Sequence, residues 1–226
     1  MEGEDNIQMR EEVWYTALRK HMVDGQIAAR GISDPAVLDA MRRLPRHLFV
    51  PENLRDDAYA DCPLPIGYGA TISQPYIVGM MTTLIEPKPG DRVLEVGAGS
   101  GYQAAILALI GCRVTTVERI PELADLAQRN LKRAGVEGIT IITGDGTALP
   151  KSEGPFDAII TTAAAPDVPS SLTALLADGG RMALPVGDID LQVLTCIHKT
   201  GDKLTISHHG AVRFVPLIGA EGWSQL

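Results

Sequence analysis

The stretch that decides the fold is Val93-Leu94-Glu95-Val96-Gly97-Ala98-Gly99-Ser100-Gly101-Tyr102. Its first residues are mainly apolar and predict a buried strand, and three glycines follow at alternate positions. An apolar run from Gln103 to Ile110 then predicts a helix. Glycines at such a strand-to-helix turn let backbone amides approach a ligand that any Cβ would exclude. The stretch therefore predicts a site for a nucleotide-like cofactor.

The spacing of the glycines indicates which kind of cofactor. A dinucleotide fingerprint would read G-x-G-x-x-G, but Tyr102 stands at its last position and Gly101 comes one residue early. The pattern E-x-G-x-G-x-G instead resembles the first motif of S-adenosylmethionine-dependent methyltransferases. It gives as cofactor-binding candidates Glu95, Gly97, Gly99, Ser100 and Gly101. A glycine-rich turn without a ligand is the structural alternative.

Composition narrows the class of protein. A chain of 226 residues suits one large α/β domain, and a net charge of −8 argues against a nucleic-acid partner, which needs a basic face. The local basic cluster Arg42, Arg43 and Arg46 is interpreted as a solvated helix face. No apolar run approaches the roughly 18 residues of a membrane span, so no membrane partner is expected. Three widely spaced cysteines suggest reduced thiols in a cytoplasmic protein and no metal site. The protein is expected to be a monomer.

The order of elements predicts a doubly wound, Rossmann-like α/β fold in a single domain, 1–226. Residues 1–80 are expected to form an N-terminal helical subdomain with a substrate loop, 81–190 the cofactor-binding core, and 191–226 a hairpin and tail. Helices are predicted at 13–23, 35–41, 76–85, 101–110, 121–134 and 169–177, with a loop at 61–75. Strands are predicted at 92–97, 113–118, 139–143, 156–163, 180–186, 191–198 and 203–214. Alternating strands and helices imply a mostly parallel sheet, and the last two strands an antiparallel edge.

Two further strand ends should join the glycine loop at one edge of this sheet. In doubly wound sheets, ligands lie outside the carboxyl ends of the strands, near the switch point. Glu118 ends the second strand, where a carboxylate can accept hydrogen bonds from both ribose hydroxyls. Asp145 and Gly146 follow the third strand, where an acceptor can bind the exocyclic amine of adenine. Together the three strand ends predict an adenosine site.

Several longer segments resemble one family, the protein-L-isoaspartate (D-aspartate) O-methyltransferases. The resemblance spans about residues 23–218. Its most specific segments are the loop Leu64-Pro65-Ile66-Gly67-Tyr68-Gly69-Ala70-Thr71-Ile72-Ser73-Gln74-Pro75-Tyr76 and the stretch Val212-Arg213-Phe214-Val215-Pro216-Leu217. Departures are Tyr68, where a glutamine is frequent, a longer N-terminus, and an unmatched tail from Gly219. The resemblance implies S-adenosylmethionine-dependent methylation of the free α-carboxylate of L-isoaspartyl residues, and less well of D-aspartyl residues, in damaged proteins and peptides.

Such an acceptor needs no general base, because a peptide carboxylate is already ionised at neutral pH. One hydroxyl suffices to hold one carboxylate oxygen, and the resemblance makes Ser73 the catalytic candidate, with Thr71 and Ile72 shaping the pocket. Ser73 could instead cap the helix that Pro75 begins. Substrate contacts are also expected from Val212 and Phe214, since an edge strand can pair with a peptide backbone, although such a strand is more commonly core.

Two other functions fit the same cofactor motifs. One is methyl transfer to a different carboxylate or to RNA. The other is a domain that binds S-adenosylmethionine without turnover. Methylation of planar amines is disfavoured, because the loop after the fourth strand, Thr161-Thr162-Ala163-Ala164-Ala165-Pro166, offers no polar acceptor beyond threonine.

Overall fold

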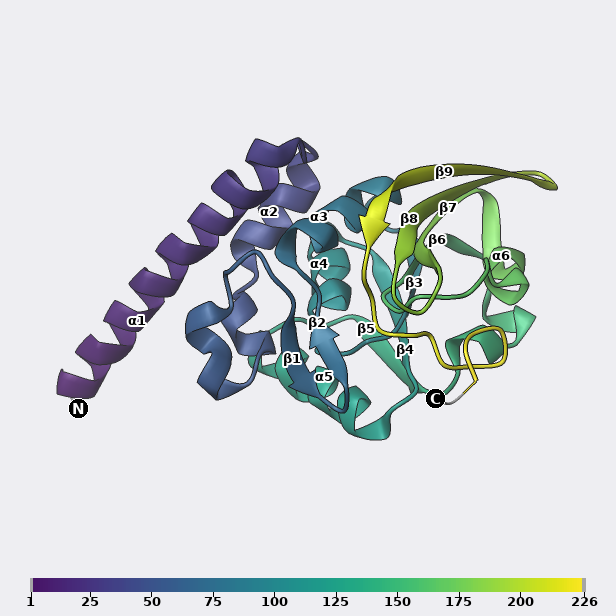
Figure 1. The fold of residues 1–226 in the computed structure, drawn as a ribbon. Coiled ribbons are helices and arrows are strands. Elements are labelled where there is room, and N and C mark those ends of the chain that lie inside the picture. Colours follow the sequence, from purple (N-terminus) through teal and green to yellow (C-terminus); the bar gives the residue numbers. More distant parts are fainter. Residues whose placement is uncertain (1, 225–226) are drawn as a thin grey trace.

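The computed structural model describes residues 2–224, with side chains from Glu11 onward; Met1, Gln225 and Leu226 lie outside the described residues. Seven strands form one sheet, with helices on both of its faces (Figure 1). The strands of this sheet are β3 (Arg92–Val96), β4 (Arg113–Glu118), β5 (Ile139–Thr143), β6 (Phe156–Thr161), β7 (Leu176–Gly187), β8 (Gln192–Thr200) and β9 (Lys203–Val212). The helices are α1 (Glu2–His21), α2 (Pro35–Arg43), α3 (Pro75–Leu84), α4 (Tyr102–Ile110), α5 (Pro121–Arg133) and α6 (Ser170–Leu175).

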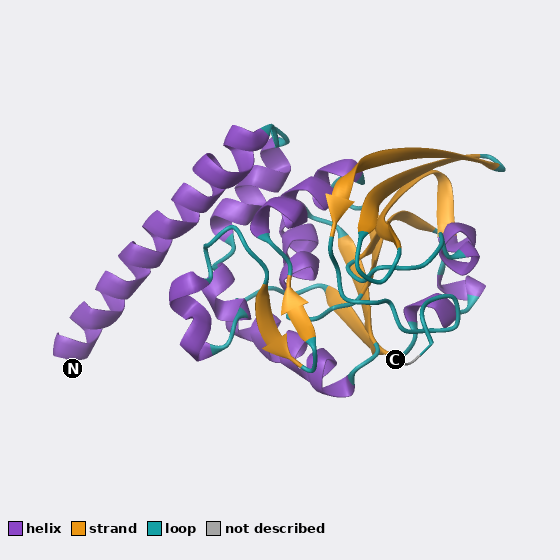
Figure 2. Ribbon diagram, in the orientation of Figure 1, coloured by secondary structure: helices purple, strands orange, loops and turns teal. Residues whose placement is uncertain are grey.

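The strand order is β5-β4-β3-β6-β7-β8-β9, parallel as far as β7 and antiparallel beyond it. The chain leaves β3 toward β4 on one side and returns to pair β6 on the other, so the switch point lies at the end of β3. This confirms the predicted doubly wound sheet with an antiparallel C-terminal edge. Five of the six described α-helices, α1 to α5, belong to the first 133 residues of the chain, whereas β6 to β9 all come after residue 155. Figure 2 distinguishes the helices from the strands by colour.

Alternation along the central strands creates two cores, one on each face of the sheet. Val93 and Ile160 face a core shared with α2, α3, α4 and α5. Leu94 and Ile159 face the opposite core, which α6 completes with Leu172. Each central strand is therefore buried on both faces, as the apolar runs of the sequence predict.

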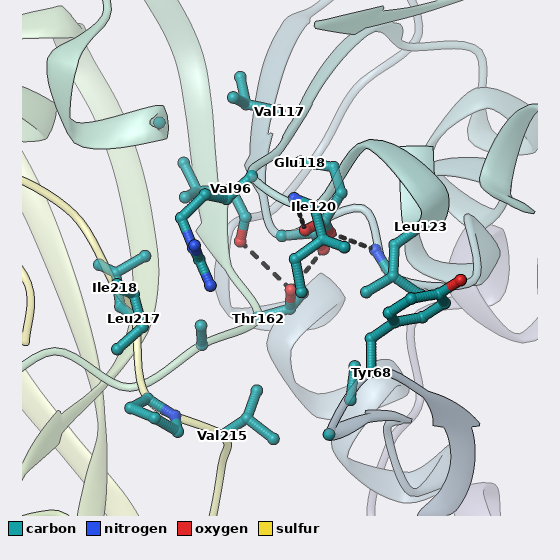
Figure 3. Close-up of a pocket in the computed structure, with 18 of the residues that line it drawn as sticks. Tyr68, Val96, Val117, Glu118, Ile120, Leu123, Thr162, Val215, Leu217 and Ile218 are labelled. Atoms are coloured by element: carbon teal, nitrogen blue, oxygen red, sulfur yellow. Dashed lines mark hydrogen bonds between the residues drawn. The ribbon is translucent and has the colours of Figure 1, made fainter. Parts of the chain in front are cut away.

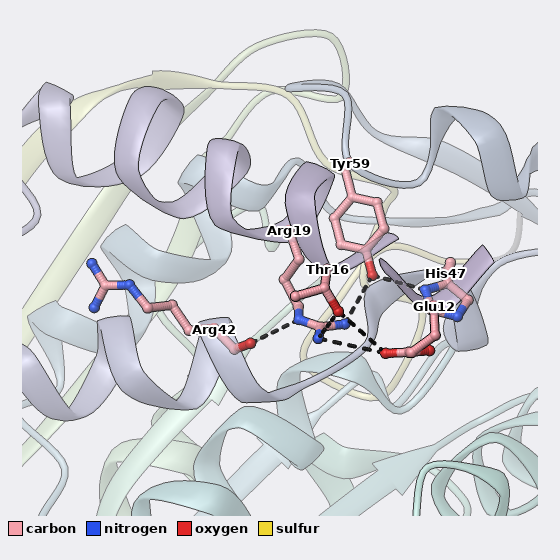
Figure 4. A network of polar contacts seen from close by, with 6 residues as sticks. All are labelled: Glu12, Thr16, Arg19, Arg42, His47 and Tyr59. Carbon is pink, nitrogen blue, oxygen red and sulfur yellow. Dashed lines mark hydrogen bonds and ion pairs between the residues drawn. The ribbon is translucent and has the colours of Figure 1, made fainter. Parts of the chain in front are cut away.

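The N-terminal helix α1 is attached to the domain at its C-terminal half by a network of polar contacts, shown in Figure 4, and by an aromatic stack. The Arg19 side chain donates from Nε to the carbonyl of Arg42 at 2.7 Å. The ring of Tyr15 stacks on His47 at 3.8 Å, and His47 Nδ1 lies 2.8 Å from the hydroxyl of Tyr59. The helix continues through a π-helical turn, Met22–Ile27, whose apolar residues are buried.

Three local expectations were wrong. The segment predicted as a loop contains a hairpin, β1 (Leu64–Gly67) with β2 (Ala70–Ile72). Its prolines and glycines disfavour strands, but buried Leu64, Ile66 and Ile72 hold it on the core. The helix predicted at 169–177 is shorter, because β7 already begins at Leu176.

The third concerns Arg46, which is fully buried in a short 3-10 helix, Arg46–Phe49, rather than on a solvated helix face. The predicted boundaries of the three regions within the domain stay predictions. No helix in residues 2–224 combines the length and apolarity that crossing a membrane requires.

Candidate active site

A cavity of about 620 Å³ lies at the carboxyl edge of the sheet, beside the switch point (Figure 3). Four parallel strands reach it through the residues at or after their ends, and the β1–β2 turn and the C-terminal segment complete it. Its lining includes Gly97, Gly99, Glu118, Ile120, Gly144, Gly146, Thr162, Thr71, Leu217 and Ile218. A cavity of this size is in the usual range for a cofactor-sized ligand.

Gly97 is the first glycine of the loop and allows the closest backbone approach at the site. Its φ is +98°, in the region that only glycine adopts at low cost, and a Cβ would overlap the hydroxyl of Thr162. That hydroxyl donates to the carbonyl of Gly97 at 2.6 Å. The same hydroxyl lies 3.2 Å from the carbonyl of Val96, so the ends of β3 and β6 are joined by a side chain as well as by the sheet; dashed lines from Thr162 mark such contacts in Figure 3.

Glu118 lies at the predicted place, at the end of β4. One carboxylate oxygen accepts from the Gly99 amide at 2.9 Å, and the other from the Ile120 amide at 3.0 Å. The side chain is thereby fixed at the edge of the cavity. Its remaining lone pairs suit the hydroxyl groups of a ribose.

Glu95 carries the one completely buried carboxylate of the glycine stretch. Its Oε2 accepts from the Thr116 hydroxyl at 2.5 Å, whereas Oε1 is buried with no hydrogen-bond partner among the described residues. Burial, and secondarily the charge of Glu118, raise the pKa of Glu95 to about 8. A small cavity of about 30 Å³ beside it is lined also by Ser73, Gly97 and Ser100. A positively charged group bound there would supply the missing partner and favour the ionised form.

These features fit S-adenosylmethionine. The orphaned Glu95 oxygen suits an ammonium group, the glycine loop leaves room for close approach, and Glu118 suits a ribose. In the described residues no cluster of three or more His, Cys, Asp and Glu is placed to hold a metal ion.

Asp145 has an additional role in the structure. Its carboxylate accepts from the amide and hydroxyl of Thr147 at 2.8 and 2.7 Å, and from the amide of Ala220 at 2.7 Å. Its neighbours Gly144 and Gly146 line the cavity, but the Asp145 side chain does not. Gly101 likewise lines no cavity and packs on Ala127 of α5.

The acceptor side of the site is a second cavity of about 290 Å³. It is lined by Ser73, Thr71, Gln74, Thr162 and residues 211–215, which include Val212 and Phe214. Ile72 is buried beside the small cavity. Thr71 and Thr162 line all three cavities and so lie between the cofactor side and the acceptor side.

The Ser73 hydroxyl is not used as a helix cap. Gln74 is the residue before α3, and no side chain caps that helix end. In the described part of the chain, the hydroxyl of half-buried Ser73 makes no hydrogen bond. The alternative interpretation of Ser73 as a cap therefore fails.

Sequence reasoning missed two contributors to the site. Thr162 carries no motif, and only the pairing of β3 with β6 brings it to Gly97. The segment Val215–Ile218 reaches the cofactor cavity because it pairs with Ala164, in the loop after β6. The Ala164 amide donates to the carbonyl of Val215 at 2.8 Å, and the Leu217 amide donates to the carbonyl of Ala164 at 2.7 Å. The family resemblance singled out residues 212–217 for contacts with the substrate, but nothing in the sequence indicated a contact of this segment with the cofactor cavity.

The sheet order, the glycine loop and the acidic strand ends define the class: a Rossmann-like, S-adenosylmethionine-dependent methyltransferase. Comparison with known proteins then narrows it. The family model described as Protein-L-isoaspartate(D-aspartate) O-methyltransferase (PCMT) matches residues 17–222. The chain belongs to this family, and its activity is S-adenosylmethionine-dependent methyl esterification of isoaspartyl residues in proteins.

Individual relatives agree with that assignment. The chain is 53% identical to protein-L-isoaspartate O-methyltransferase of Methanospirillum hungatei over 92% of this chain and 96% of the relative. It is 50% identical to that of Methanopyrus kandleri over 92% and 94%. A solved Plasmodium falciparum structure described as a protein-L-isoaspartate O-methyltransferase, in complex with S-adenosyl-L-homocysteine, has a TM-score of 0.79 and 29% identity, covering 88% of this chain and 98% of that one.

We expect Gly97→Ala to weaken binding of S-adenosylhomocysteine at least tenfold, measured by isothermal titration calorimetry, because the added methyl group meets Thr162. Gly90→Ala is the matched control. Gly90 has a similar φ of +93° but nothing within 4 Å of its added Cβ. Both substitutions carry the backbone cost of roughly 1–2 kcal/mol, whereas Gly97→Ala alone adds a clash, and does so in the lining of the cofactor cavity. Equal affinities of the two variants would contradict this explanation.

We also expect Glu95 to make the cofactor-free protein less stable as pH rises toward 8. A carboxyl pKa raised to about 8 means that the folded state retains a proton that the unfolded state loses near 4.5. Burial lowers the pKa of His47 to about 4. That group has the opposite effect, but mainly below its ordinary pKa of 6.5, so it does not offset the Glu95 effect between pH 6.5 and 8.

Urea unfolding across that window tests the pH effect. The unfolding free energy of the wild type should fall with rising pH, whereas that of Glu95→Gln should change less. Parallel slopes in the two proteins would show that Glu95 is already ionised.

Proposed function

We propose that Ser73 orients the isoaspartyl carboxylate for methyl transfer. The observation that carries this proposal is the position of Ser73, which lines both the acceptor cavity and the small cavity beside Glu95 and Gly97. Its hydroxyl is available to donate to one carboxylate oxygen. The other oxygen is then left facing the cofactor side, where it can act as the nucleophile.

The cofactor would be held by the residues of the three strand ends. We assign this role to Glu95, Gly97, Gly99, Ser100, Gly101, Glu118, Asp145 and Gly146. Glu95 would pair with the ammonium group and Glu118 with the ribose. Neither Gly101 nor Asp145 lines the cavity, so their effect on the cofactor would be indirect. Gly101 would act through the backbone of the glycine loop, and Asp145 through its bond to the C-terminal segment. When bound, the cofactor supplies an electrophilic methyl group on a sulfonium sulfur.

The protein's own contribution is alignment and exclusion of water. The carboxylate needs no deprotonation, so no proton has to move before the transfer. Ser73 fixes the acceptor, and Thr71 and Ile72 shape the space on either side of it. Holding two reactants in attack geometry can replace much of the entropy cost of their encounter.

The peptide substrate would lie along the acceptor cavity. Its lining includes Val212, at the end of the sheet's edge strand, and Phe214, whose amide is already bound by Gln192 at 2.9 Å. Contacts with the peptide backbone rather than with specific side chains would let one enzyme accept many damaged sequences. We extend the proposal to D-aspartyl residues as weaker substrates. In the methyl ester, the backbone amide nitrogen of the following residue attacks the esterified carbonyl, and methanol leaves. Water then opens the resulting succinimide, in part to aspartate.

The setting we propose is a monomer acting on proteins and peptides in the cytoplasm, without nucleic acid. Three free cysteines and the acidic net charge of −8 support this setting.

Matched peptides that differ only in isoaspartate or aspartate test the substrate. With methyl-labelled S-adenosylmethionine, we expect base-labile label on the isoaspartyl peptide and background label on the aspartyl one. Equal labelling of both peptides would remove the proposed specificity.

For Ser73→Ala we expect at least a tenfold loss of kcat on the isoaspartyl peptide, because the acceptor carboxylate loses its hydrogen-bond donor. Affinity for S-adenosylhomocysteine should stay within twofold of the wild type. Ser152→Ala is the control and should leave both quantities unchanged. It removes an exposed hydroxyl from the 3-10 helix Lys151–Glu153, which precedes β6, whereas the cavity lies at the carboxyl end of that strand. Wild-type turnover of Ser73→Ala would exclude the proposed role.

A further inference from the structure

Arg46 is the largest of the completely buried side chains, and it is a charged one. Its Nε donates to the carbonyl of Ala58 at 2.8 Å, and its Nη2 to the carbonyl of Ser73 at 2.7 Å. The guanidinium carbon lies 4.8 Å from the ring centre of Tyr102. No carboxylate among the described residues pairs with Arg46, and its Nη1 has no hydrogen-bond partner there.

This arrangement is a costly way to stabilise a fold. A buried ion without a counter-ion loses its hydration, and two carbonyls and an aromatic face replace that loss only in part. Burial accordingly lowers the pKa of Arg46. Burial also raises the pKa of Tyr102 to about 12, so the tyrosine stays neutral and provides no negative charge. Apolar residues of the same volume are often as stabilising as such a group.

The backbone at Ser73 explains what the guanidinium does. The strand β2 ends at Ile72, and the first hydrogen bond of α3 runs from the Val78 amide to the Gln74 carbonyl. Ser73 therefore falls between two elements, and neither of them holds its carbonyl. Pro75 has no amide hydrogen to help fix this turn.

Hydrogen bonds from two long side chains hold the turn instead. Gln74 donates to the carbonyl of Asp61 at 3.1 Å, and Arg46 donates to that of Ser73 itself. The planar fork of Arg46 ties Ser73 to Ala58, which is completely buried at the end of the 3-10 helix Glu52–Asp57. A guanidinium presents both donors in one rigid plane, which neither lysine nor the shorter glutamine can do at this span.

We propose that Arg46 is a positioning residue for the methyl transfer, which acts by fixing the peptide group of Ser73 and hence the direction of its hydroxyl. The inference rests on the proposed role of Ser73. It assigns to a residue with no access to substrate or cofactor a share of the catalytic rate.

The test uses Arg46→Gln in the full-length protein, with Arg92→Gln as the matched control. Arg92 also donates to two carbonyls, those of Pro155 and Glu153, both at 2.8 Å, and lies 5.0 Å from the ring centre of Phe156. It lies at the opposite end of β3 from the glycine loop. Steady-state kinetics on the isoaspartyl peptide, calorimetric binding of S-adenosylhomocysteine and thermal melting are measured for each variant.

For Arg46→Gln we expect kcat to fall at least tenfold, with smaller change in KM and with S-adenosylhomocysteine affinity within twofold of the wild type. Arg92→Gln should stay within twofold in kcat. In a Ser73→Ala background, adding Arg46→Gln should lower kcat by less than twofold, because both changes remove the same oriented hydroxyl.

Additive losses in the double variant, or wild-type kcat in Arg46→Gln, would overturn the inference while leaving the role of Ser73 intact. Wild-type turnover in Ser73→Ala would overturn both. A parallel loss of kcat, cofactor affinity and melting temperature would show a merely structural role. If Arg46→Gln does not fold, Arg46→Lys keeps the charge and can reach one carbonyl at a time; a tenfold lower kcat at normal cofactor affinity is expected, and unchanged kcat would count against the inference.

Discussion

The contact between Gly97 and Thr162 is the constraint on which the rest of the site depends. It lies at the switch point of the sheet, between the carboxyl ends of β3 and β6, so it fixes how these two strand ends approach each other. Because Gly97 has no Cβ, its backbone can turn at a positive φ toward α4, and the Thr162 hydroxyl can fill the space that a side chain would take. Glu118 then binds the same loop from the other side through Gly99. These two attachments fix the part of the cofactor cavity wall that the glycine loop forms.

Much of this could be predicted from the sequence, because the signals are local. The strand-glycine-helix pattern around Gly97 specifies a parallel sheet with a ligand at its carboxyl edge. That sheet in turn brings Glu118 and Gly146 together although they are far apart in the chain. Residue order alone also distinguished the cofactor class, since Tyr102 stands where a dinucleotide site has glycine. In these cases the backbone requires glycine at particular positions, and the spacing of those glycines can be read in the sequence.

The remainder depends on contacts that no local pattern encodes. The hairpin of β1 and β2 forms against its own propensities, because burying Leu64 and Ile66 outweighs the cost of its glycines. Arg46 looked like one of three surface arginines, and only the tertiary structure distinguishes it from Arg42 and Arg43. Asp145 was selected for its place at a strand end, yet its oxygens bind Thr147 and Ala220. Side-chain direction decides such cases, and spacing does not determine it.

The segment from Leu217 to Ala220 has a consequence for the order in which the site is assembled during folding. Leu217 and Ile218 line the cofactor cavity, and the amide of Ala220 binds Asp145, which stands 75 residues earlier in the chain. Closing the cofactor cavity therefore requires a contact across a loop of 75 residues. The entropy cost of closing so long a loop has to be met before the contact contributes any stability, whereas the glycine loop forms from neighbouring residues. The first half of the site is thus a product of local folding, and the cavity is complete only when the long-range structure has formed.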